Sequence, residues 1–412
     1  MRAELIAVGT ELLLGQITDT NATYLARLLA AHGVDLLHKQ TVGDNLERAR
    51  QAVVLALGRA DLILTSGGLG PTEDDLTVEA VALAAGVPLI FDQSVADTIA
   101  AFFTQRRRPA PESVFRQARV PQGARVVPNR RGTAPGLIVP VGDRTIFMFP
   151  GVPHEMEGLV TDGLVPWLRA HAGEDVIRSR VLRITGLGES MVEEQVRDLI
   201  HGTNPTVAPL AKLGEVHLRI TAKGRPDTVD PLIAEVEAAL RSRLRDAVFG
   251  ADDDTLQEVT ARLLVARGVT LAVAESCTAG LVASRLTEMP GSSAFLLAGF
   301  VPYSNEAKVR DVGVPADLLA AHGAVSAEVA MALASGARRR AGADLGLAVT
   351  GIAGPGGGTS DKPVGLVYLA AADEAGARAS ELNYGAGPGR EIIRHLVAQA
   401  AINLLRLTLL RR

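Results

Sequence analysis

The strongest constraint on the fold is a recurring pattern: a short apolar run, a glycine-containing loop, and then a segment with apolar residues at helical spacing. Residues 3–9 (AELIAVG) form such a run, and residues 21–33 (NATYLARLLAAHG) follow with an Asn start signal and a Gly stop. Residues 61–77 (DLILTSGGLGPTEDDLT) repeat the pattern before an Ala-rich helix to Ala85. This alternation predicts an α/β fold with a parallel sheet, helices on both faces and binding loops at the carboxyl ends of the strands.

The length predicts more than one domain, because 412 residues correspond to two or three domains of roughly 150 residues each. Residues 181–200, 215–224 and 231–244 predict a small α+β module that ends just after Phe249, and a fresh α/β pattern runs from Thr255. Aromatic residues make up only 3%, so Ala, Val and Leu fill the core, which suits helices on a parallel sheet.

Charge and cysteine content restrict the partners and the compartment. The net charge is −4, with 42 basic and 46 acidic residues, which argues against nonspecific binding of nucleic-acid backbones. The single cysteine, Cys277, allows no internal disulfide and fits a reducing compartment. No secretory signal and no window of about 18 uncharged apolar residues are found. We therefore expect a cytoplasmic protein without a membrane span.

The first candidate centre lies in residues 271–280 (LAVAESCTAG), an apolar strand followed by small polar residues and a helical segment. Ser276 is expected at or just before the helix N-terminus, where free backbone N–H groups can stabilise an oxyanion or hold a phosphate. The alternative is an ordinary helix cap. Lys308 follows 32 positions later and could serve as a general base if burial lowers its pKa, or could be a solvated helix lysine.

Two further features point to a nucleotide. Residues 347–365 (LAVTGIAGPGGGTSDKPVG) are a strand that enters a Gly-rich loop, which allows close approach of backbone to a phosphate or ribose. Arg390 and Arg394 are one helical turn apart and could clamp a phosphate or be surface charges.

A second candidate centre lies in residues 65–77. Gly67, Gly68 and Gly70 expose backbone N–H groups, and residues 73–75 (Glu-Asp-Asp) offer hard oxygen ligands for Mg²⁺. Phosphate and metal binding at one loop suits pyrophosphate cleavage, whereas the alternative is that the acids cap the next helix.

The C-terminal motifs ESCTAG, FVPYSNEAK, GAVS and TGIAGPGGG…KPVG together resemble the CinA C-terminal domain, which contains the nicotinamide mononucleotide deamidases. The resemblance implies a nicotinamide-nucleotide amidohydrolase that forms nicotinic acid mononucleotide and ammonia without a cofactor, as a step of pyridine-nucleotide salvage. By motif, Ser276 is the nucleophile or the hydroxyl that contacts the carboxamide, with Tyr303 and Lys308 as activating partners. Whether Ser276 attacks the carboxamide or orients a water for Lys308 stays open.

The same resemblance supplies the other positions of this site. Further residues that it implies contact the substrate are Glu275, Thr278, Gly280, Thr350, Gly351, Gly354 and Arg390, of which the last faces the phosphate. Cys277 is interpreted as a small buried neighbour rather than as a nucleophile. The chain departs from the family pattern at Ala279, where a Gly is usual, and at Pro302, where a Thr is common.

The N-terminal motifs VGTELLLGQITDTN, TVGDN, TSGGLGPTEDDLT, GTAPG and FPGVPHEM resemble the CinA N-terminal domain, which is similar to the molybdopterin-binding fold, a three-layer αβα domain. The implied activity is an ADP-ribose pyrophosphatase that releases AMP and ribose 5-phosphate with Mg²⁺, Mn²⁺ or Co²⁺, with K⁺ as a further candidate ion. The implied metal ligands are Asp44, Asp74 and Asp75, and Asp75 is also the catalytic position. The implied substrate contacts are Gly9, Glu11, Asn21, Gly67, Gly68, Gly70, Thr72, Thr133, Pro135 and Gly151.

The expected organisation is a molybdopterin-binding-like domain (1–170), a KH-type connector (176–250) and a deamidase domain (255–412). The partners expected are the two nucleotides and a second copy of the chain in a homodimer, with no membrane and no nucleic acid, because the module lacks a clear GxxG clamp with basic flanks. Two alternatives are a molybdopterin-binding protein and a competence or recombination accessory protein.

Overall fold

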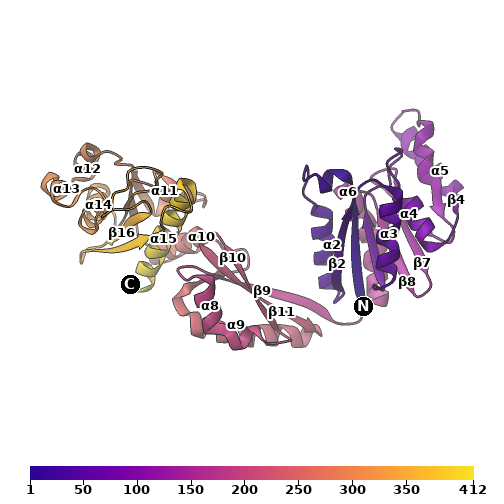
Figure 1. Cartoon of the computed structure of the whole chain (residues 1–412), viewed down its shortest axis with the longest axis horizontal. Helices are drawn as coiled ribbons and strands as arrows, with labels where there is room; N and C mark the ends of the chain where they lie inside the picture. The colour runs from indigo at the N-terminus through magenta and orange to yellow at the C-terminus, as the bar shows by residue number, and fades with distance from the viewer. The chain divides into compact units, whose positions relative to one another are not determined.

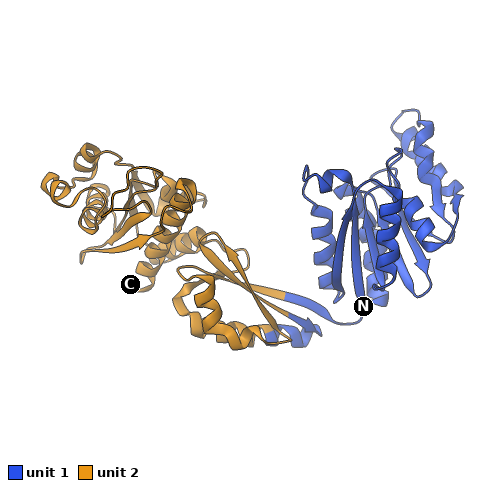
Figure 2. Ribbon diagram, in the orientation of Figure 1, with its two compact units in different colours: residues 1–178, 222–232 blue, residues 179–221, 233–412 orange.

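The computed structural model describes all residues from Met1 to Arg412. Its contacts divide the chain into two compact units, coloured separately in Figure 2: residues 1–178 with 222–232, and residues 179–221 with 233–412. The first unit contains the N-terminal α/β domain. The second contains the C-terminal α/β domain and most of the middle module.

The N-terminal domain is built on a six-stranded sheet with strand order β2-β1-β3-β8-β7-β6. The first four of these strands are parallel, and β7 and β6 continue the sheet antiparallel. The strands are β1 (Arg2–Val8), β2 (Asp35–Val42), β3 (Leu62–Ser66), β6 (Arg125–Val127), β7 (Gly136–Val141) and β8 (Arg144–Phe149). The predicted α/β architecture is confirmed, with an antiparallel edge in addition.

Helices cover both faces of this sheet (Figure 1). Leu5 and Leu64 pack on one face with α2, α6 and α7, whereas Ile6 and Ile63 pack on the other with α3 and α4. Successive strand side chains point to opposite faces, so a sheet covered on both sides needs uninterrupted apolar strands. The helices are α1 (Thr10–Leu13), α2 (Thr20–Ala31), α3 (Leu46–Leu57), α4 (Thr77–Ala85), α6 (Pro153–Leu159) and α7 (Val165–His171), with the π-helical η2 (Val160–Leu164) before α7.

The segment between α4 and β6 contains a helix that we did not predict, α5 (Gln93–Gln105). Asp92 caps it by accepting the N–H groups of Ser94 and Val95. An Asp followed by apolar residues at helical spacing is a start signal, so the sequence did carry the information. The other elements here are β4 (Leu89–Phe91), η1 (Glu112–Ala118) and β5 (Arg119–Pro121), and β4 pairs antiparallel with β5.

The middle module is a four-stranded sheet of order β10-β11-β9-β12 with two helices, which confirms the predicted α+β character. Its elements are β9 (Val176–Ile184), α8 (Glu189–Ile200), β10 (Thr206–Lys212), β11 (Glu215–Gly224), α9 (Pro226–Leu244), η3 (Arg245–Ala247) and β12 (Val248–Ala251).

The C-terminal domain has a five-stranded sheet of order β14-β13-β15-β16-β17, in which the first three strands are parallel and the last two antiparallel. The strands are β13 (Leu271–Glu275), β14 (Leu296–Phe300), β15 (Leu345–Gly351), β16 (Leu366–Ala372) and β17 (Ala377–Asn383). The helices are α10 (Leu256–Arg267), α11 (Leu281–Thr287), η4 (Ser292–Ala294), α12 (Asn305–Val312), α13 (Ala316–His322), α14 (Ala327–Ala341) and α15 (Arg390–Leu410).

The two faces of this sheet differ in side-chain size. Leu271 and Val273 of β13 pack toward α10, α11 and α15, whereas Ala272 and Ala274 pack toward α14. Small residues bring α14 close, since a Cβ on Gly346 of β15 would lie 2.0 Å from the Ala334 carbonyl oxygen. The many alanines of this domain therefore allow α14 to pack closely against the sheet.

Helix α15 is long and apolar enough, by length and composition alone, to cross a membrane, but half of its apolar window is buried. Ile393, Val397 and Ile402 of this helix belong to the domain core with Leu271 and Val273. The sequence was expected to contain no long apolar window free of charge, and α15 does carry two charged residues, Arg394 and Arg406. In this fold α15 is a core helix.

Candidate active sites

Three loops of the C-terminal domain meet where the parallel strands end. Strands β14, β13 and β15 are neighbours and end at Phe300, Glu275 and Gly351. Because parallel strands present their carboxyl ends at one edge of the sheet, the loops that carry Ser276, Tyr303 and residues 352–365 gather there. The edge of the sheet at which a ligand is expected therefore carries Ser276, Tyr303 and the Gly-rich loop that the sequence singled out.

Lys308 and Ser276 contact each other in this site. Lys308 lies on α12 and is only 1% exposed, and its Nζ lies 3.4 Å from Ser276 Oγ. Nζ also donates to the Pro302 and Tyr303 carbonyl oxygens, each at 3.0 Å. Burial lowers the pKa of Lys308 from the ordinary lysine value of 10.5. The alternative of a solvated helix lysine is excluded by this burial.

The departure at Pro302 has no chemical consequence for this contact, since Lys308 uses the backbone carbonyl of residue 302. Tyr303 likewise contacts Lys308 through its carbonyl rather than its hydroxyl. The Tyr303 hydroxyl accepts a hydrogen bond from Arg390 Nη2 at 3.1 Å. Arg390, the first residue of α15, also donates to the Gly354 carbonyl at 2.8 Å, which joins the Gly-rich loop to the site.

Ser276 does not lie directly at a helix N-terminus, and the amides at the start of the next helix are not free. Helix α11 begins at Leu281, five positions after Ser276, with Gly280 as its N-cap residue. The carboxylate of Glu275, which is 1% exposed, accepts the N–H groups of Gly280, Val282 and Ala283 at 2.8–3.0 Å. Those amides are therefore occupied, because the preceding carboxylate folds back to cap the helix.

Cys277 packs in the domain core, where burial raises the pKa of its thiol to about 12. A thiol at that pKa carries almost no thiolate near neutral pH, and the thiolate is the nucleophilic form. This agrees with the interpretation of Cys277 as a buried neighbour of Ser276.

The turn after Ser276 holds two buried polar atoms without a partner. Thr278 Oγ1 and Arg394 Nε are both buried and form no hydrogen bond, although Arg394 Nη2 donates to the Thr278 carbonyl at 2.8 Å. Buried polar groups are nearly always paired, so these two atoms on touching residues stand out in the domain. From the sequence, Arg394 was a candidate phosphate ligand only because it lies one helical turn from Arg390, and its contact with Thr278 could not be predicted.

Thr350, Gly351 and Gly354 shape the loop after β15. The Thr350 hydroxyl is buried and donates to the Ala324 carbonyl at 2.7 Å. A Cβ on Gly351 would lie 2.6 Å from Val367 Cγ2, and one on Gly354 would lie 2.7 Å from Val364 Cγ1. Gly351 is required for close packing against β16, and Gly354 for close packing inside the loop.

The N-terminal domain contains a cavity of about 410 Å³ at the carboxyl ends of its parallel strands. Most of the predicted positions line it: Gly9, Glu11, Asp44, Gly67, Gly68, Gly70, Asp74, Asp75, Thr133 and Gly151. These positions are far apart in sequence. They line one cavity because the loops that carry them follow neighbouring parallel strands and so lie at the same edge of the sheet.

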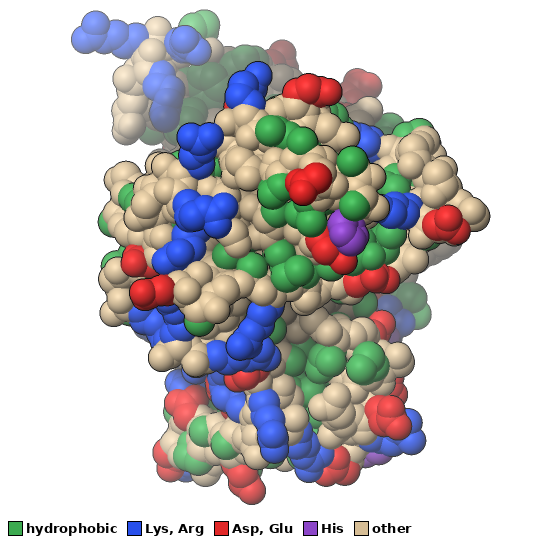
Figure 3. Space-filling model, turned by 90° about the vertical axis from the view of Figure 1, so that its left-hand side faces the viewer, with side chains coloured by type: hydrophobic (Ala, Val, Ile, Leu, Met, Phe, Trp, Pro, Cys, Tyr) green, Lys and Arg blue, Asp and Glu red, His purple; other side chains and the backbone are tan.

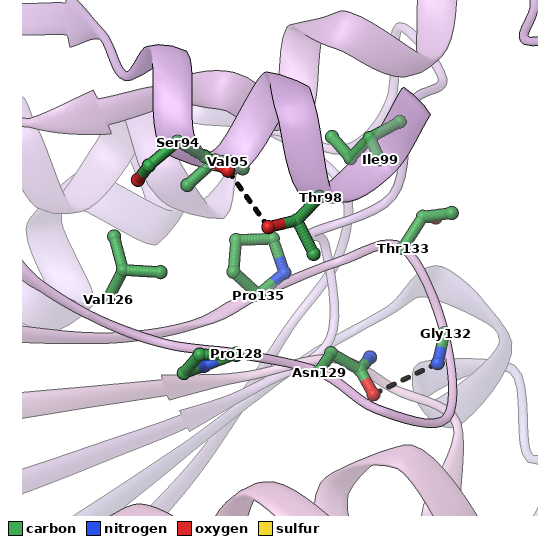
Figure 4. Close-up of a pocket in the computed structure, with 10 residues that line it drawn as sticks. All are labelled: Ser94, Val95, Thr98, Ile99, Val126, Pro128, Asn129, Gly132, Thr133 and Pro135. Carbon is green, nitrogen blue, oxygen red and sulfur yellow. Dashed lines mark hydrogen bonds between the residues drawn. The ribbon is translucent and has the colours of Figure 1, made fainter. Parts of the chain in front are cut away.

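Three predicted positions lie outside the lining of this cavity. Asn21 is buried and donates to Ser66 Oγ and to the Gly151 carbonyl, so it fixes the loop after β8. Thr72 donates to Asp75 through both its amide and its hydroxyl. Pro135 lines a neighbouring cavity, which Figure 4 shows between α5 and residues 126–135.

The expected cluster of metal ligands is not formed by the protein alone. Asp44, Asp74 and Asp75 all line the cavity, yet no group of three or more Asp, Glu, His or Cys side chains is close enough to hold an ion. Asp44 accepts the Thr10 N–H at 3.0 Å, and Asp75 is held by Thr72. Asp44 is thus held by the segment after β1, and Asp75 by its own loop.

Two lining residues were missed by the sequence reasoning. Gln117 is 7% exposed and donates to the Leu69 carbonyl, and its Oε1 is buried without a partner. Glu155 accepts from Asn129 Nδ2 at 2.6 Å. Glu155 lies within the FPGVPHEM motif and could have been included, whereas nothing in the sequence around Gln117 marks it.

The side of the second unit seen in Figure 3 carries Lys and Arg interspersed with Asp and Glu.

Three family models match successive parts of the chain. The "Probable molybdopterin binding domain" matches residues 4–170, the "Damage-inducible protein CinA KH domain" residues 179–250, and the "CinA C-terminal domain" residues 253–409.

Relatives match over most of their length. A "Putative competence-damage inducible protein" of Moorella thermoacetica is 53% identical over 90% of both chains. A "CinA-like protein" of Gloeobacter violaceus is 47% identical over 98% of this chain and 96% of its own. Among solved structures, the protein CinA from Thermoplasma acidophilum is 35% identical, with a TM-score of 0.39, over 41% of this chain and 99% of its own.

Proposed function

The chain belongs to the CinA family, and on this premise we propose that it is a bifunctional nucleotide hydrolase whose C-terminal domain deamidates nicotinamide mononucleotide. The observation that carries the proposal is the buried Lys308 amine beside the Ser276 hydroxyl. A serine next to a base is the arrangement that activates a hydroxyl as a nucleophile.

The surroundings of Lys308 also accommodate a neutral amine. A neutral amine has two N–H groups and one lone pair, and the carbonyls of Pro302 and Tyr303 accept two hydrogen bonds from Nζ. As an ammonium, Lys308 Nζ donates to Ser276 Oγ at 3.4 Å, and once it has lost one proton its lone pair can instead accept the Ser276 hydroxyl proton. Burial lowers the pKa of Lys308, which increases the neutral fraction at a given pH.

The proposed reaction begins when Ser276 Oγ attacks the carboxamide carbon and its proton passes to Lys308 Nζ. The tetrahedral intermediate then collapses, the C–N bond breaks, and Lys308 returns the proton to the leaving ammonia. Water then attacks the ester and gives a proton to Lys308 Nζ, the C–O bond to Ser276 breaks, and Lys308 returns the proton to Ser276 Oγ as nicotinic acid mononucleotide leaves. The proton count balances at each step, and no further reactant than water is needed.

Two groups of donors can hold the rest of the substrate. The backbone N–H groups of Cys277 and Thr278 are not used in backbone hydrogen bonds, so they are the donors available for an oxyanion beside Ser276. Arg390 and Arg394, with the unpartnered Thr278 Oγ1, supply cationic and polar groups for the 5′-phosphate.

Ammonia release from nicotinamide mononucleotide by the purified protein tests this function. Stoichiometric ammonia and nicotinic acid mononucleotide are expected. No release by folded protein would refute the deamidase proposal. Mass spectrometry of enzyme quenched during turnover would distinguish the serine ester from a mechanism in which Ser276 only orients a water.

For the N-terminal domain we propose hydrolysis of ADP-ribose to AMP and ribose 5-phosphate. The support is the 410 Å³ cavity lined by the Gly67–Gly70 loop and by carboxylates, with the buried unpartnered Gln117 Oε1 at its wall. Water adds to one phosphorus atom and the bridging P–O bond breaks. The backbone N–H groups of a glycine-rich loop suit the diphosphate.

The donor chemistry of this cavity fits a hard divalent ion, since Mg²⁺ is commonly held by one or two carboxylates together with substrate phosphates and water. Asp44, Asp74 and Asp75 would hold it, and a bound ion would neutralise charge on the diphosphate. AMP formation from ADP-ribose, measured with Mg²⁺, Mn²⁺ and Co²⁺ in turn and with or without K⁺, tests this activity. Recovery of intact ADP-ribose under every condition would refute it.

We propose further that the protein acts in pyridine-nucleotide salvage as a cytoplasmic homodimer. The single cysteine suits a reducing compartment, and closed two-fold dimers are the commonest assembly of soluble enzymes. Sedimentation at micromolar concentration should give twice the 43.1 kDa of one chain.

A further inference from the structure

The middle module supplies no residue to either proposed reaction, yet it lies against the C-terminal domain within the second unit. Two of its glycines allow its turns to approach α15. A Cβ on Gly186 would lie 3.3 Å from Asn403 Nδ2, and a Cβ on Gly214 would lie 3.2 Å from Gln399 Cγ. Both glycines also have positive φ, of +82° and +78°, so a side chain is disfavoured at each position for two reasons.

Apolar packing does not fill the space between the module and the domain. A cavity of about 570 Å³ lies there, with walls from the turn between β9 and α8, the hairpin of β10 and β11, strand β17 and helix α15. Because the two parts are separated over this space, the connection between them depends on the contacts at its border.

Gln399 of α15 is the centre of these contacts. Its side chain is buried, its Nε2 donates to Glu215 Oε1 at 2.9 Å, and its Oε1 accepts from Arg285 Nη2 at 2.6 Å. The two partners fix the orientation of the amide, because a carboxylate only accepts and a guanidinium only donates. Gln399 therefore joins β11 of the middle module to α11 of the C-terminal domain.

Glu215 is well placed to anchor this connection. Its side chain is 16% exposed, and its other oxygen contacts His217 Nε2 of the same module at 2.8 Å. One end of the carboxylate is thus held by the module, and the other end faces α15.

Arg285 has no carboxylate in direct contact. Its Nη2 also donates to Gln257 Oε1 at 2.8 Å, and its Nη1 is buried without a partner. Burial lowers the pKa of Arg285, and the nearby charges of Glu288 and Glu215 oppose that shift. Buried charges are usually paired, and here the Glu215 carboxylate reaches the guanidinium through the amide of Gln399.

Both helices that Gln399 connects begin at the candidate active site. Helix α11 follows the turn after Ser276, and α15 begins with Arg390. Arg394, also on α15, donates from Nη2 to the Thr278 carbonyl of that turn at 2.8 Å. How α11 and α15 are held together therefore affects the two arginines proposed to bind the phosphate.

We propose that Glu215 of the middle module is a positioning residue for the deamidase. Through Gln399 it fixes α15 against α11, and so it holds Arg390 and Arg394 in place for the substrate phosphate. The proposal rests on the proposed deamidation of nicotinamide mononucleotide, and it gives the middle module a part in that reaction. Ser276 and Lys308 lie outside this chain of contacts, so the effect should be on substrate binding rather than on the chemical step.

Steady-state kinetics of ammonia release by the full chain, with titration calorimetry of nicotinic acid mononucleotide, test the role of Glu215. In Glu215→Ala we expect KM and Kd each to rise about fivefold at unchanged kcat, an effect typical of a residue that acts on a site without touching it. Gln399→Leu should give the same rise. The double variant should be no worse than either single variant, because both changes remove one connection.

Glu189→Ala is the matched control, because Glu189 is an exposed acid of the same module, lines the same cavity and lies outside the chain of hydrogen bonds. It should change neither KM nor Kd. A lower kcat at unchanged KM in Glu215→Ala would overturn the positioning role. Additive effects in the double variant, or an equal rise in Glu189→Ala, would do the same.

The two measurements separate the positioning role from the proposed function. If wild-type protein releases no ammonia but Glu215→Ala still weakens binding of the mononucleotide about fivefold, the deamidase proposal fails and the positioning role stands. If wild-type protein releases ammonia and Glu215→Ala has the same KM, the deamidase proposal stands and the positioning role fails. Wild-type protein that neither reacts with nor binds a mononucleotide would overturn both.

Discussion

Lys308 Nζ lies 3.4 Å from Ser276 Oγ, although the two residues are 32 positions apart and belong to different connections of the C-terminal sheet. Taken singly, each has an ordinary structural explanation. Together with the burial of Lys308 their contact fits the proposed nucleophile and base, which leads to the first two predictions.

Removal of either partner should stop deamidation. Ser276→Ala and Lys308→Met should each lower kcat for ammonia release, the second by roughly 10²- to 10⁴-fold, as for loss of a general base. Cleavage of ADP-ribose should be unchanged, because it occurs in another domain. Lys212→Met, at an exposed lysine of the middle module, is the control. Full deamidase activity in both variants would show that the site lies elsewhere.

The pH dependence of deamidation should report Lys308. A general base must be neutral, so kcat should rise with pH as Lys308 loses its proton. Because burial lowers the pKa of Lys308, the midpoint of this rise should lie below 10.5. A profile of kcat from pH 5 to 11 measures it. A flat profile in wild-type protein would exclude Lys308 as the titrating base.

We expect Glu275 to stabilise the fold of the C-terminal domain rather than to contact the substrate. Its carboxylate accepts three amides at the start of α11, so Glu275→Gln should lower the unfolding free energy of the domain by roughly 1.5–3 kcal/mol, the range for hydrogen bonds to a charged group. Differential scanning calorimetry and steady-state kinetics on the same sample check this. Loss of activity at unchanged Tm would instead indicate contact with the substrate.

Ala279 occupies a backbone conformation that favours glycine, with φ of +53°. This explains why the family pattern usually has Gly there, and Ala279→Gly should stabilise the domain by roughly 0.5–1 kcal/mol. The neighbouring Gly280 has φ of +94°, so Gly280→Ala should lower Tm. Calorimetry of both variants tests the pair. A lower Tm for Ala279→Gly would contradict the strain argument.

Asp75 should matter only for the N-terminal reaction. Asp75→Asn keeps the size of the side chain and removes its charge, and it should lower metal-dependent AMP formation roughly 10- to 100-fold, the range for loss of support at a metal site. Ammonia release should be unchanged. Asp97→Asn, at an exposed position of α5 outside both cavities, is the control. Equal AMP formation by both variants would remove Asp75 from the site.

Periodicity gave a correct prediction of the central strands, because β1, β3 and β13 are buried on both faces and are therefore mostly apolar. Helix α5 was missed, although Asp92 marks its start. The antiparallel edges β7–β6 and β16–β17 also could not be predicted, since strand direction depends on the connections and the apolar pattern is the same in both cases.

The sequence by itself determined which groups are present: a serine and a lysine after buried strands, a glycine loop followed by acids, and the motifs of one family. Only the tertiary structure decided how those groups are used. Glu275 occupies the amides at the start of α11, Thr72 holds Asp75, and α5 completes a cavity that no motif marks. The physical reason is that hydrogen bonds and burial depend on distances across the fold, which local spacing does not specify.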